Sequence, residues 1–364
     1  MVKIKQLPED FVVREIFEKQ PRREGWKGEE DERGSYIWCD LTKRNYDLFR
    51  ALKFLSGRLG VSPKRFGYAG TKDKRAVTTQ KISVWNIPLE RLQAVRLRDI
   101  ELSNFEEARE RITLGDLKAN DFEITVRDVE EHAQKAAEHN LEKIKKNGFI
   151  NLFGGQRFGN RNNTHLVGRE ILRGNLKEAV WLYLAGEGDN DEEIQAFRKR
   201  LRESGDVKAG LSECPRVLRN ELIMLNHLVH EPSDYAGALR RLPKKMRTML
   251  VHAYQSYLWN EMARACDEAT IPMVGMDTDF SKYKTAGKMQ EIMDNEGVKC
   301  ADFKIDSMPE LSCEGAERER VAVAEKMQWA FASDELNAGK IKCILHFAIP
   351  KGSYATVLID EVFA

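Results

Sequence analysis

Apolar and polar residues alternate along several stretches of the chain, as they do in β-strands with one buried face. The clearest alternation covers 341–349, where every second residue is apolar. The apolar positions there are Ile341, Cys343, Leu345, Phe347 and Ile349. Strand-like runs also cover four earlier stretches, namely 11–16, 35–41, 76–85 and 100–126. The pattern therefore predicts strands near both ends of the chain.

Other stretches repeat their apolar residues at helical spacing. One such segment is 45–60, where Gly60 is placed to end the helix, and another is 129–146. The apolar positions of the first segment are Phe49, Leu52, Leu55 and Leu59. Strands, a helix, strands and another helix in the first part of the chain predict an α+β domain on a mixed, largely antiparallel sheet.

The middle of the chain is dominated by helical spacing, which marks 175–184, 191–203 and 246–268. With 364 residues, the chain is long enough for two domains. We therefore expect residues 160–319 to form a separate, mostly helical α/β unit.

Charge and cysteine content narrow the class of protein. The formal net charge is only +1, so a polyanionic partner would have to meet basic residues gathered on one face. Six scattered cysteines without a C-x-x-C pair argue against a disulfide scaffold or a zinc ribbon.

His227, His230 and Glu231 lack further ligands, so we expect no metal. The absence of a signal peptide and of a membrane-spanning apolar run predicts a soluble cytoplasmic protein.

The stretch 66–80, F-G-Y-A-G-T-K-D-K-R-A-V-T-T-Q, centres on one acidic side chain. Asp73 lies between Lys72 and Lys74, and the preceding glycines permit a tight loop through positive φ or a close backbone approach. Because the flanking cations favour an ionised carboxylate, Asp73 is a candidate nucleophile. The alternative is a solvated turn whose charges only keep the loop in water. The stretch lacks the spacing of a phosphate-cradling nucleotide loop.

A second stretch, 151–159, reads N-L-F-G-G-Q-R-F-G. Two phenylalanines among glycines, together with an arginine, suit base stacking and phosphate pairing. The alternative is a turn whose phenylalanines cover the core. Without further context, the turn is the favoured interpretation.

These two stretches, with D-F-V-V-R-E at 10–15 and F-A-I-P-K-G-S-Y-A-T at 347–356, resemble signature segments of the TruD family of transfer-RNA pseudouridine synthases. The resemblance implies that Asp73 is the catalytic residue, that Lys5 lies near the active site and that Asn151 is part of it. It also implies that Phe153 stacks on the target uracil and that Phe347 borders the uracil pocket.

The resemblance also implies an overall organisation and a reaction. Residues 1–159 and 320–364 would form a discontinuous catalytic domain, 160–319 the insertion domain, and a V-shaped cleft would accept transfer RNA. The expected reaction is conversion of uridine to pseudouridine at position 13 of transfer RNA, by a monomer and without a cofactor. The main alternative is a non-catalytic RNA-binding or chaperone protein on the same scaffold. A phosphate-binding hydrolase ranks last because a metal-binding carboxylate set is lacking.

A nearly neutral chain that binds RNA must place its acids away from the bound strand. The acidic run 29–32 should therefore lie outside the RNA surface, and basic residues next to the two signature stretches should face the backbone phosphates. The candidates for these contacts are Lys64, Arg65, Lys72, Lys74, Arg75, Arg157 and Arg161.

Overall fold

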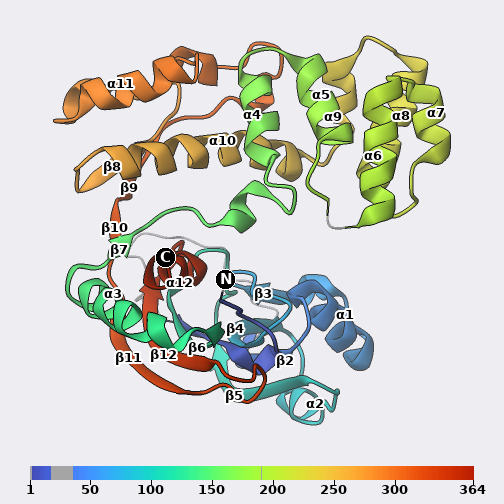
Figure 1. Ribbon diagram of the computed structural model, residues 1–364. Coiled ribbons are helices and arrows are strands. Elements are labelled where there is room, and N and C mark those ends of the chain that lie inside the picture. The colour runs from blue at the N-terminus through green and yellow to red at the C-terminus, as the bar shows by residue number, and fades with distance from the viewer. Residues whose placement is uncertain (1, 18–35, 190) are drawn as a thin grey trace. The chain divides into compact units, whose positions relative to one another are not determined.

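The computed structural model describes residues 2–17, 36–189 and 191–364, which form two compact units (Figure 1). Unit 1 consists of Met1–Phe149 and Ala322–Ala364, and unit 2 of Ile150–Val321. The chain thus passes between the units at 149/150 and 321/322, and the stretch 151–159 packs with unit 2. The division into a catalytic domain and an insertion domain at 159/160 and 319/320 stays a prediction. The acidic run 29–32 lies outside the described residues.

Unit 1 is built on an eight-stranded sheet with the order β11-β12-β6-β1-β4-β2-β5, and β3 pairs with β4. Among the described strands, β1 and β4 are parallel and the other pairs of this sheet are antiparallel. The strands are β1 (Phe11–Phe17), β2 (Tyr36–Arg44), β3 (Phe66–Tyr68), β4 (Val77–Trp85), β5 (Ile100–Ala108), β6 (Leu117–Val129), β11 (Glu325–Ser333) and β12 (Ile341–Pro350). The prediction of a mixed, largely antiparallel sheet is confirmed.

Helices cover this sheet and create two separate cores. The first core joins β12 and β6 to α3 (Gln134–Asn147) and α12 (Ala355–Val362). Its β12 side chains are the alternating set that the sequence predicted, and the buried members are Cys343, Leu345, Phe347 and Ile349. The second core packs α1 (Leu48–Leu59) on β2 and β4, while the short α2 (Leu89–Gln93) closes its edge.

Helix α1 ends where the sequence predicted, but it begins at Leu48 rather than at residue 45, and its buried face differs. The Asp47 side chain accepts the N–H of Arg50, and Gly60 adopts φ 66 to end the helix. The buried stripe starts at Leu48, whereas Phe49 is 60% exposed. The assignment of Phe49 to the core face was therefore wrong, because the stripe follows the 3.6-residue repeat from Leu48 rather than from Phe49.

Unit 2 is mostly helical, as predicted. Its helices are α4 (Thr164–Leu172), α5 (Leu176–Ala185), α6 (Glu192–Ser204), α7 (Val207–Glu213), α8 (Arg219–His230), α9 (Tyr235–Arg240), α10 (Lys244–Ala265) and α11 (Ala286–Asn295). A two-stranded sheet of β8 (Thr270–Met273) and β9 (Ala316–Glu319) packs with them. Where the chain passes between the units, β7 (Phe149–Ile150) pairs with β10 (Val321–Ala322).

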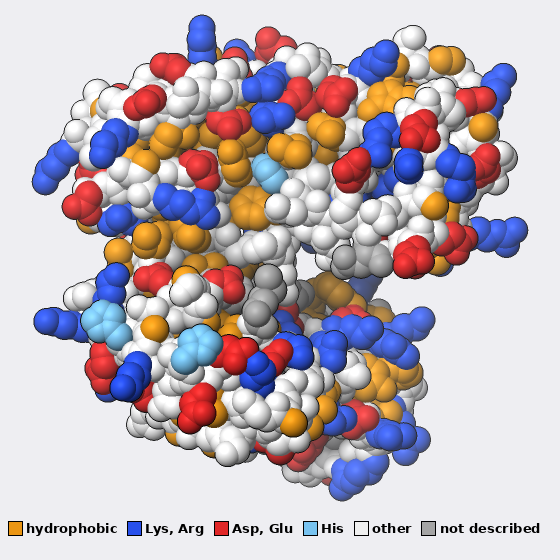
Figure 2. Space-filling view, in the orientation of Figure 1, with side chains coloured by type: hydrophobic (Ala, Val, Ile, Leu, Met, Phe, Trp, Pro, Cys, Tyr) orange, Lys and Arg blue, Asp and Glu red, His pale blue; other side chains and the backbone are white. Residues whose placement is uncertain are grey.

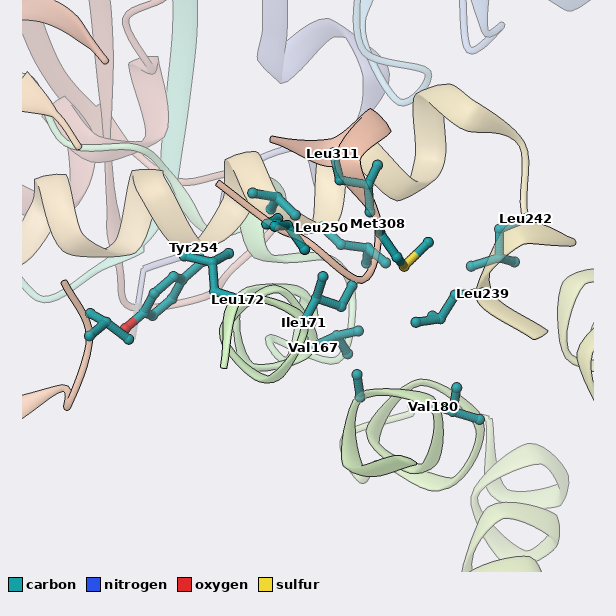
Figure 3. Close-up of a cluster of buried hydrophobic side chains, with 14 of the residues drawn as sticks. Val167, Ile171, Leu172, Val180, Leu239, Leu242, Leu250, Tyr254, Met308 and Leu311 are labelled. Carbon is teal, nitrogen blue, oxygen red and sulfur yellow. The ribbon is translucent and has the colours of Figure 1, made fainter. Parts of the chain in front are cut away.

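The long helix α10 is the centre of the unit 2 core. Figure 3 shows Val167 and Ile171 of α4 beside Leu250 of α10 within this buried cluster. The two helices approach so closely at Gly168 that a Cβ there would lie 2.1 Å from the Leu250 carbonyl oxygen. Within the described parts of the chain, no helix is long and apolar enough to cross a membrane.

Candidate active site

Asp73 lies on the loop 69–76, which connects β3 to β4 in unit 1. The loop leaves a closely packed strand, because a Cβ at Gly67 would lie 2.4 Å from both the Ile112 carbonyl oxygen and Ser83 Oγ. At Gly70, the carbonyl oxygen accepts a hydrogen bond of 2.9 Å from Gln80 Nε2. The first glycine therefore serves a close backbone approach, as the sequence suggested.

The carboxylate of Asp73 pairs with the ammonium of Lys5. Lys5 Nζ lies 2.7 Å from Asp73 Oδ2, and the side chains are 17% and 32% exposed, respectively. The backbone of Lys5 adopts φ 60, which is uncommon for a residue with a side chain, and Lys5 Nζ lies 4.1 Å from the centre of the Phe11 ring. The fold thus brings together the two charged residues singled out by the resemblance, in a place that solvent still reaches.

The backbone of the Asp73 loop is held by Lys43, which was not a candidate from the sequence. Lys43 comes from β2 and is completely buried. Its Nζ donates to the carbonyl oxygens of Tyr46 at 2.6 Å, Asp73 at 2.8 Å and Lys72 at 3.4 Å. Burial lowers the pKa of Lys43 to about 8, although the nearby Asp73 and Asp47 carboxylates oppose that shift.

Lys72 does not face solvent as an RNA-binding cation would. Its ammonium pairs with the Glu15 carboxylate of β1, and these side chains are only 8% and 1% exposed. Burial raises the pKa of Glu15, and the positive charge of Lys72 opposes that rise. We therefore remove Lys72 from the residues expected to contact phosphate. Its visible role is to tie the Asp73 loop to β1.

A row of aromatic rings leads from the Lys5–Asp73 pair into the first core. Phe11 packs edge-on against Phe122 at 5.8 Å, and Phe122 stacks on Phe347 at 5.5 Å with an interplanar angle of 22°. Phe347 is fully buried. It therefore supports the rings beneath Lys5, and its predicted contact with uracil would require those rings to be displaced.

Asn151 and Phe153 belong to unit 2, where Arg318 of β9 holds both. One Arg318 nitrogen donates to the Asn151 carbonyl oxygen at 2.9 Å and to Asn151 Oδ1 at 2.7 Å. The Arg318 guanidinium carbon also lies 4.3 Å from the centre of the Phe153 ring, within cation–π range. Arg318 was not a sequence candidate, because nothing in E-R-E-R at 317–320 distinguishes it from a solvated charge run.

The backbone around Phe153 is fixed by Asn260 of α10. The Phe153 N–H donates to Asn260 Oδ1 at 2.8 Å, and Asn260 Nδ2 donates to the Phe153 carbonyl oxygen at 3.0 Å. Trp259 packs edge-on against the Phe153 ring at 5.6 Å. The ring is thus held in a defined orientation while remaining partly exposed, as a stacking platform would need to be.

The sequence model of the family described as tRNA pseudouridine synthase D (TruD) matches residues 1–267 and 262–362. The chain belongs to this family. A protein of Methanosarcina barkeri named "Probable tRNA pseudouridine synthase D" is 35% identical over 98% of this chain and 92% of its own length. A protein of Archaeoglobus fulgidus with the same name is 39% identical over 98% and 93%.

A solved structure is similar over the same range. The crystal structure described as "Putative tRNA pseudouridine synthase D (TruD) from Methanosarcina mazei" matches over 100% of this chain and 93% of its own, with 34% identity and a TM-score of 0.82. The TruD resemblance drawn from short signature stretches therefore extends to the whole fold, including the helical unit 2 that contributed little to it.

The remaining basic candidates of this TruD-family chain differ in how they are held. Lys64, Lys74 and Arg75 are exposed, and Arg75 donates to the Gln6 carbonyl oxygen at 3.0 Å. Arg65 is partly buried, donates to the Asn86 carbonyl oxygen and lies 5.2 Å from the centre of the Trp85 ring. Lys64, Lys74 and Arg75 are thus accessible cations near Asp73 in the sequence.

In unit 2, Arg157 and Arg161 have structural partners of their own. Arg157 Nε donates to Ser256 Oγ at 2.9 Å. Arg161 donates to the carbonyl oxygens of Tyr183 and Gly186, and burial lowers the pKa of Arg161. Arg157 also lines an open pocket without acidic residues. The other residues that line it are Lys244, Lys245, Thr248, Met249 and His252.

Figure 2 shows lysine and arginine side chains distributed over the visible face of both units and interspersed with acidic ones. This agrees with the balanced net charge of +1. Phosphate contacts on this face would therefore come from small groups of cations rather than from one continuous basic surface.

Proposed function

We propose that this chain isomerises one uridine of a transfer RNA to pseudouridine, with Asp73 as the catalytic group. The observation that carries the proposal is the Lys5–Asp73 ion pair of 2.7 Å on a firmly held, solvent-accessible loop, in a chain of the TruD family. As a TruD-family member, the chain is an isomerase. The assignment of Asp73 rests on its position in the signature stretch and on this geometry.

The reaction needs a carboxylate and, because it is redox-neutral, no oxidant or reductant. The N1–C1′ bond of uridine breaks, a C5–C1′ bond forms, the proton on C5 leaves and N1 gains a proton. Carboxylates assist cleavage at sugar anomeric carbons by attack or by stabilising positive charge. Asp73 could attack C1′, attack C6 or abstract a sugar proton, and the Lys5 ammonium stabilises the ionised carboxylate that each route needs.

The target base must leave its stack before a protein side chain can reach its glycosidic bond. We assign the stacking role to Phe153, because Arg318, Trp259 and Asn260 fix its ring and backbone. Asn151 is buried, with its Oδ1 accepting from Arg318 and its Nδ2 donating to the Glu319 carbonyl oxygen, so it would support the segment next to the base. The proposed target is the uridine at position 13.

Mapping the product tests this proposal. The chain is incubated with an unmodified transfer-RNA transcript, without cofactors, and pseudouridine is located by chemical sequencing. We expect one modified position, and a transcript with cytidine in place of uridine 13 should yield no product. Product at another uridine would overturn the assignment of position 13 as the target. Tight binding without any product would favour a non-catalytic RNA-binding protein.

Lys5→Met should slow the chemical step about 10²-fold, as expected when one preorganised charge is removed from an active site. Affinity for transfer RNA should change little, because one charge contributes little to an extended phosphate interface. Single-turnover rates at saturating enzyme and filter-binding affinities separate the two effects. The matched control is Lys3→Met, two residues before Lys5 in the sequence, which removes an exposed ammonium paired with Asp128. An unchanged single-turnover rate in Lys5→Met would show that Lys5 takes no part in the chemical step.

Binding of transfer RNA should depend strongly on salt. Each phosphate contact contributes about −0.7 to −0.9 to the slope of log affinity against log salt concentration. Lys64→Ala and Lys74→Ala in unit 1, and Lys244→Ala and Lys245→Ala in unit 2, should each reduce the slope by about one contact. Lys199→Ala on α6, whose ammonium faces Glu203 at 3.9 Å, should leave it unchanged. A wild-type slope near zero would show that stacking and shape hold the RNA instead.

A further inference from the structure

Lys43 is the most deeply buried charged group near the proposed catalytic residue. It is 0% exposed and lies in β2. This strand pairs directly with β4, the strand that follows the Asp73 loop. Its Nζ meets three carbonyl oxygens, those of Tyr46, Lys72 and Asp73. An ammonium group has three N–H donors, so this set of acceptors matches its full donor capacity.

These acceptors lie where the backbone has no strand partner. Residues 70–73 lie between β3 and β4 without regular secondary structure, so their carbonyl oxygens need other donors. Gln80 supplies one donor to Gly70, and Lys43 supplies donors to Lys72 and Asp73. Asp73 is thus held at both ends, through its carbonyl oxygen by Lys43 and through its carboxylate by Lys5.

We propose that Lys43 is a positioning residue that fixes the backbone of the Asp73 loop, so that the Asp73 carboxylate is oriented toward Lys5 and the substrate. The proposal rests on the proposed catalytic role of Asp73. Because Lys43 has no exposed surface, it acts through Asp73 and does not touch the RNA. A carboxylate displaced by about 1 Å loses on the order of 10²-fold in rate, so a loop anchor of this kind affects chemistry far more than binding.

The charge of Lys43 is needed for this role. A neutral amine has two N–H donors and would leave one of the three carbonyl oxygens without a partner. The charged groups that act on Lys43 are Asp73 and Lys72 of the loop and Asp47 at the start of α1. Burial places the pKa of Lys43 at about 8, within the range of an ordinary pH–rate profile. The rate should therefore fall as the pH rises through about 8 and Lys43 loses its proton.

The test compares single-turnover pseudouridine formation and transfer-RNA affinity in wild type, Lys43→Met and Lys43→Arg. We expect Lys43→Met to lose about 10²-fold in rate with affinity within a few-fold of wild type. Lys43→Arg keeps its charge at all accessible pH values, so its profile should lack the wild-type decline above pH 8. Lys81→Met is the matched control, because the Lys81 ammonium pairs with Asp40 at 2.9 Å on the same two strands.

Several outcomes would overturn the proposal. A wild-type rate in Lys43→Met, an equal loss in Lys81→Met, or an alkaline decline that persists in Lys43→Arg would each do so. If Lys43→Met fails to fold by circular dichroism, the pH profiles of wild type and Lys43→Arg decide the question. Failure of the proposed function is distinguishable, because wild type itself would then form no pseudouridine at any pH.

Discussion

Asp73→Asn should abolish pseudouridine formation while leaving transfer-RNA affinity within a few-fold of wild type. Asparagine keeps the shape of the side chain and can still accept a hydrogen bond from Lys5, which lies 2.7 Å away. It cannot carry the negative charge that attack or proton abstraction requires. Loss of a principal catalytic group typically costs about 10⁴-fold or more, whereas affinity depends mainly on phosphate contacts.

The measurement for Asp73→Asn is the single-turnover rate with enzyme in excess, together with the affinity for the same transcript. Asp306→Asn makes the same chemical change at an exposed position of unit 2 and should retain the wild-type rate. A wild-type rate in Asp73→Asn would exclude Asp73 as the catalytic group. Weak binding together with lost activity would point instead to a misfolded loop.

Arg127→Met should destabilise unit 1 by about 3–5 kcal/mol, the cost typical of breaking a buried ion pair from one side. Arg127 lies in β6 and is buried between two carboxylates. Its guanidinium is 2.9 Å from both Asp10 and Asp334, whose side chains are almost completely buried. Methionine fills similar volume but leaves both carboxylates buried without their cation.

The same cluster holds the segment that carries Lys5. Asp10 Oδ2 accepts the Leu7 N–H at 2.7 Å, and the Lys3 N–H donates to the Arg127 carbonyl oxygen at 2.8 Å. Loss of the Arg127 side chain should therefore lower activity as well as stability, by loosening the segment around Lys5. A second buried ion pair, between Glu15 of β1 and Lys72 of the Asp73 loop, ties that loop to the sheet.

Urea denaturation of Arg127→Met measures the effect, with Arg14→Met as the control. Arg14 lies on the neighbouring β1, is 50% exposed and pairs with acids at 3.8 Å, so its loss should cost less than about 1 kcal/mol. Equal stability of the two variants would contradict the importance assigned to the buried cluster.

The pH dependence of stability provides a second readout of this cluster. Burial alone would raise the pKa of Asp334, but hydrogen bonds from the Asp128 N–H, Asn337 and Arg127 outweigh burial and lower it. An acid with a lowered pKa stabilises the fold above its unfolded value of about 3.9 and loses that contribution as the pH falls further. Wild type should therefore lose stability below about pH 4, and Arg127→Met should lose less.

Periodicity predicted the strands and helices whose buried faces are regular. The alternation of β12 and the apolar spacing of α10 are local properties, and both elements form where the sequence indicated. The face of α1 was misassigned at Phe49 because its neighbour Leu48 fits the same spacing and only packing decides between them. The run 112–114 looked strand-like, yet it lies between β5 and β6, and Leu114 is exposed.

Candidate site residues could be predicted only where a signature stretch pointed to them. Asp73 and Lys5 were singled out in this way, and the fold brings them to 2.7 Å of each other although they are far apart in sequence. Lys43 was not singled out and Lys72 was assigned to phosphate contact, because a lysine followed by an arginine or flanked by charges is most often a solvated cation. Their buried roles depend on partners that only the folded sheet brings near, namely the loop carbonyls for Lys43 and Glu15 for Lys72.

Release of tritium from transfer RNA labelled at C5 of uridine tests the proposed isomerisation most directly, because a C5–C1′ bond cannot form without loss of that atom. The labelled transfer RNA and the chain are incubated in buffer without cofactor, and solvent tritium is measured over time. We expect release that levels off at one equivalent per transfer RNA and is absent with Asp73→Asn. Transfer RNA that binds the wild-type chain but releases no tritium would contradict the proposed isomerisation.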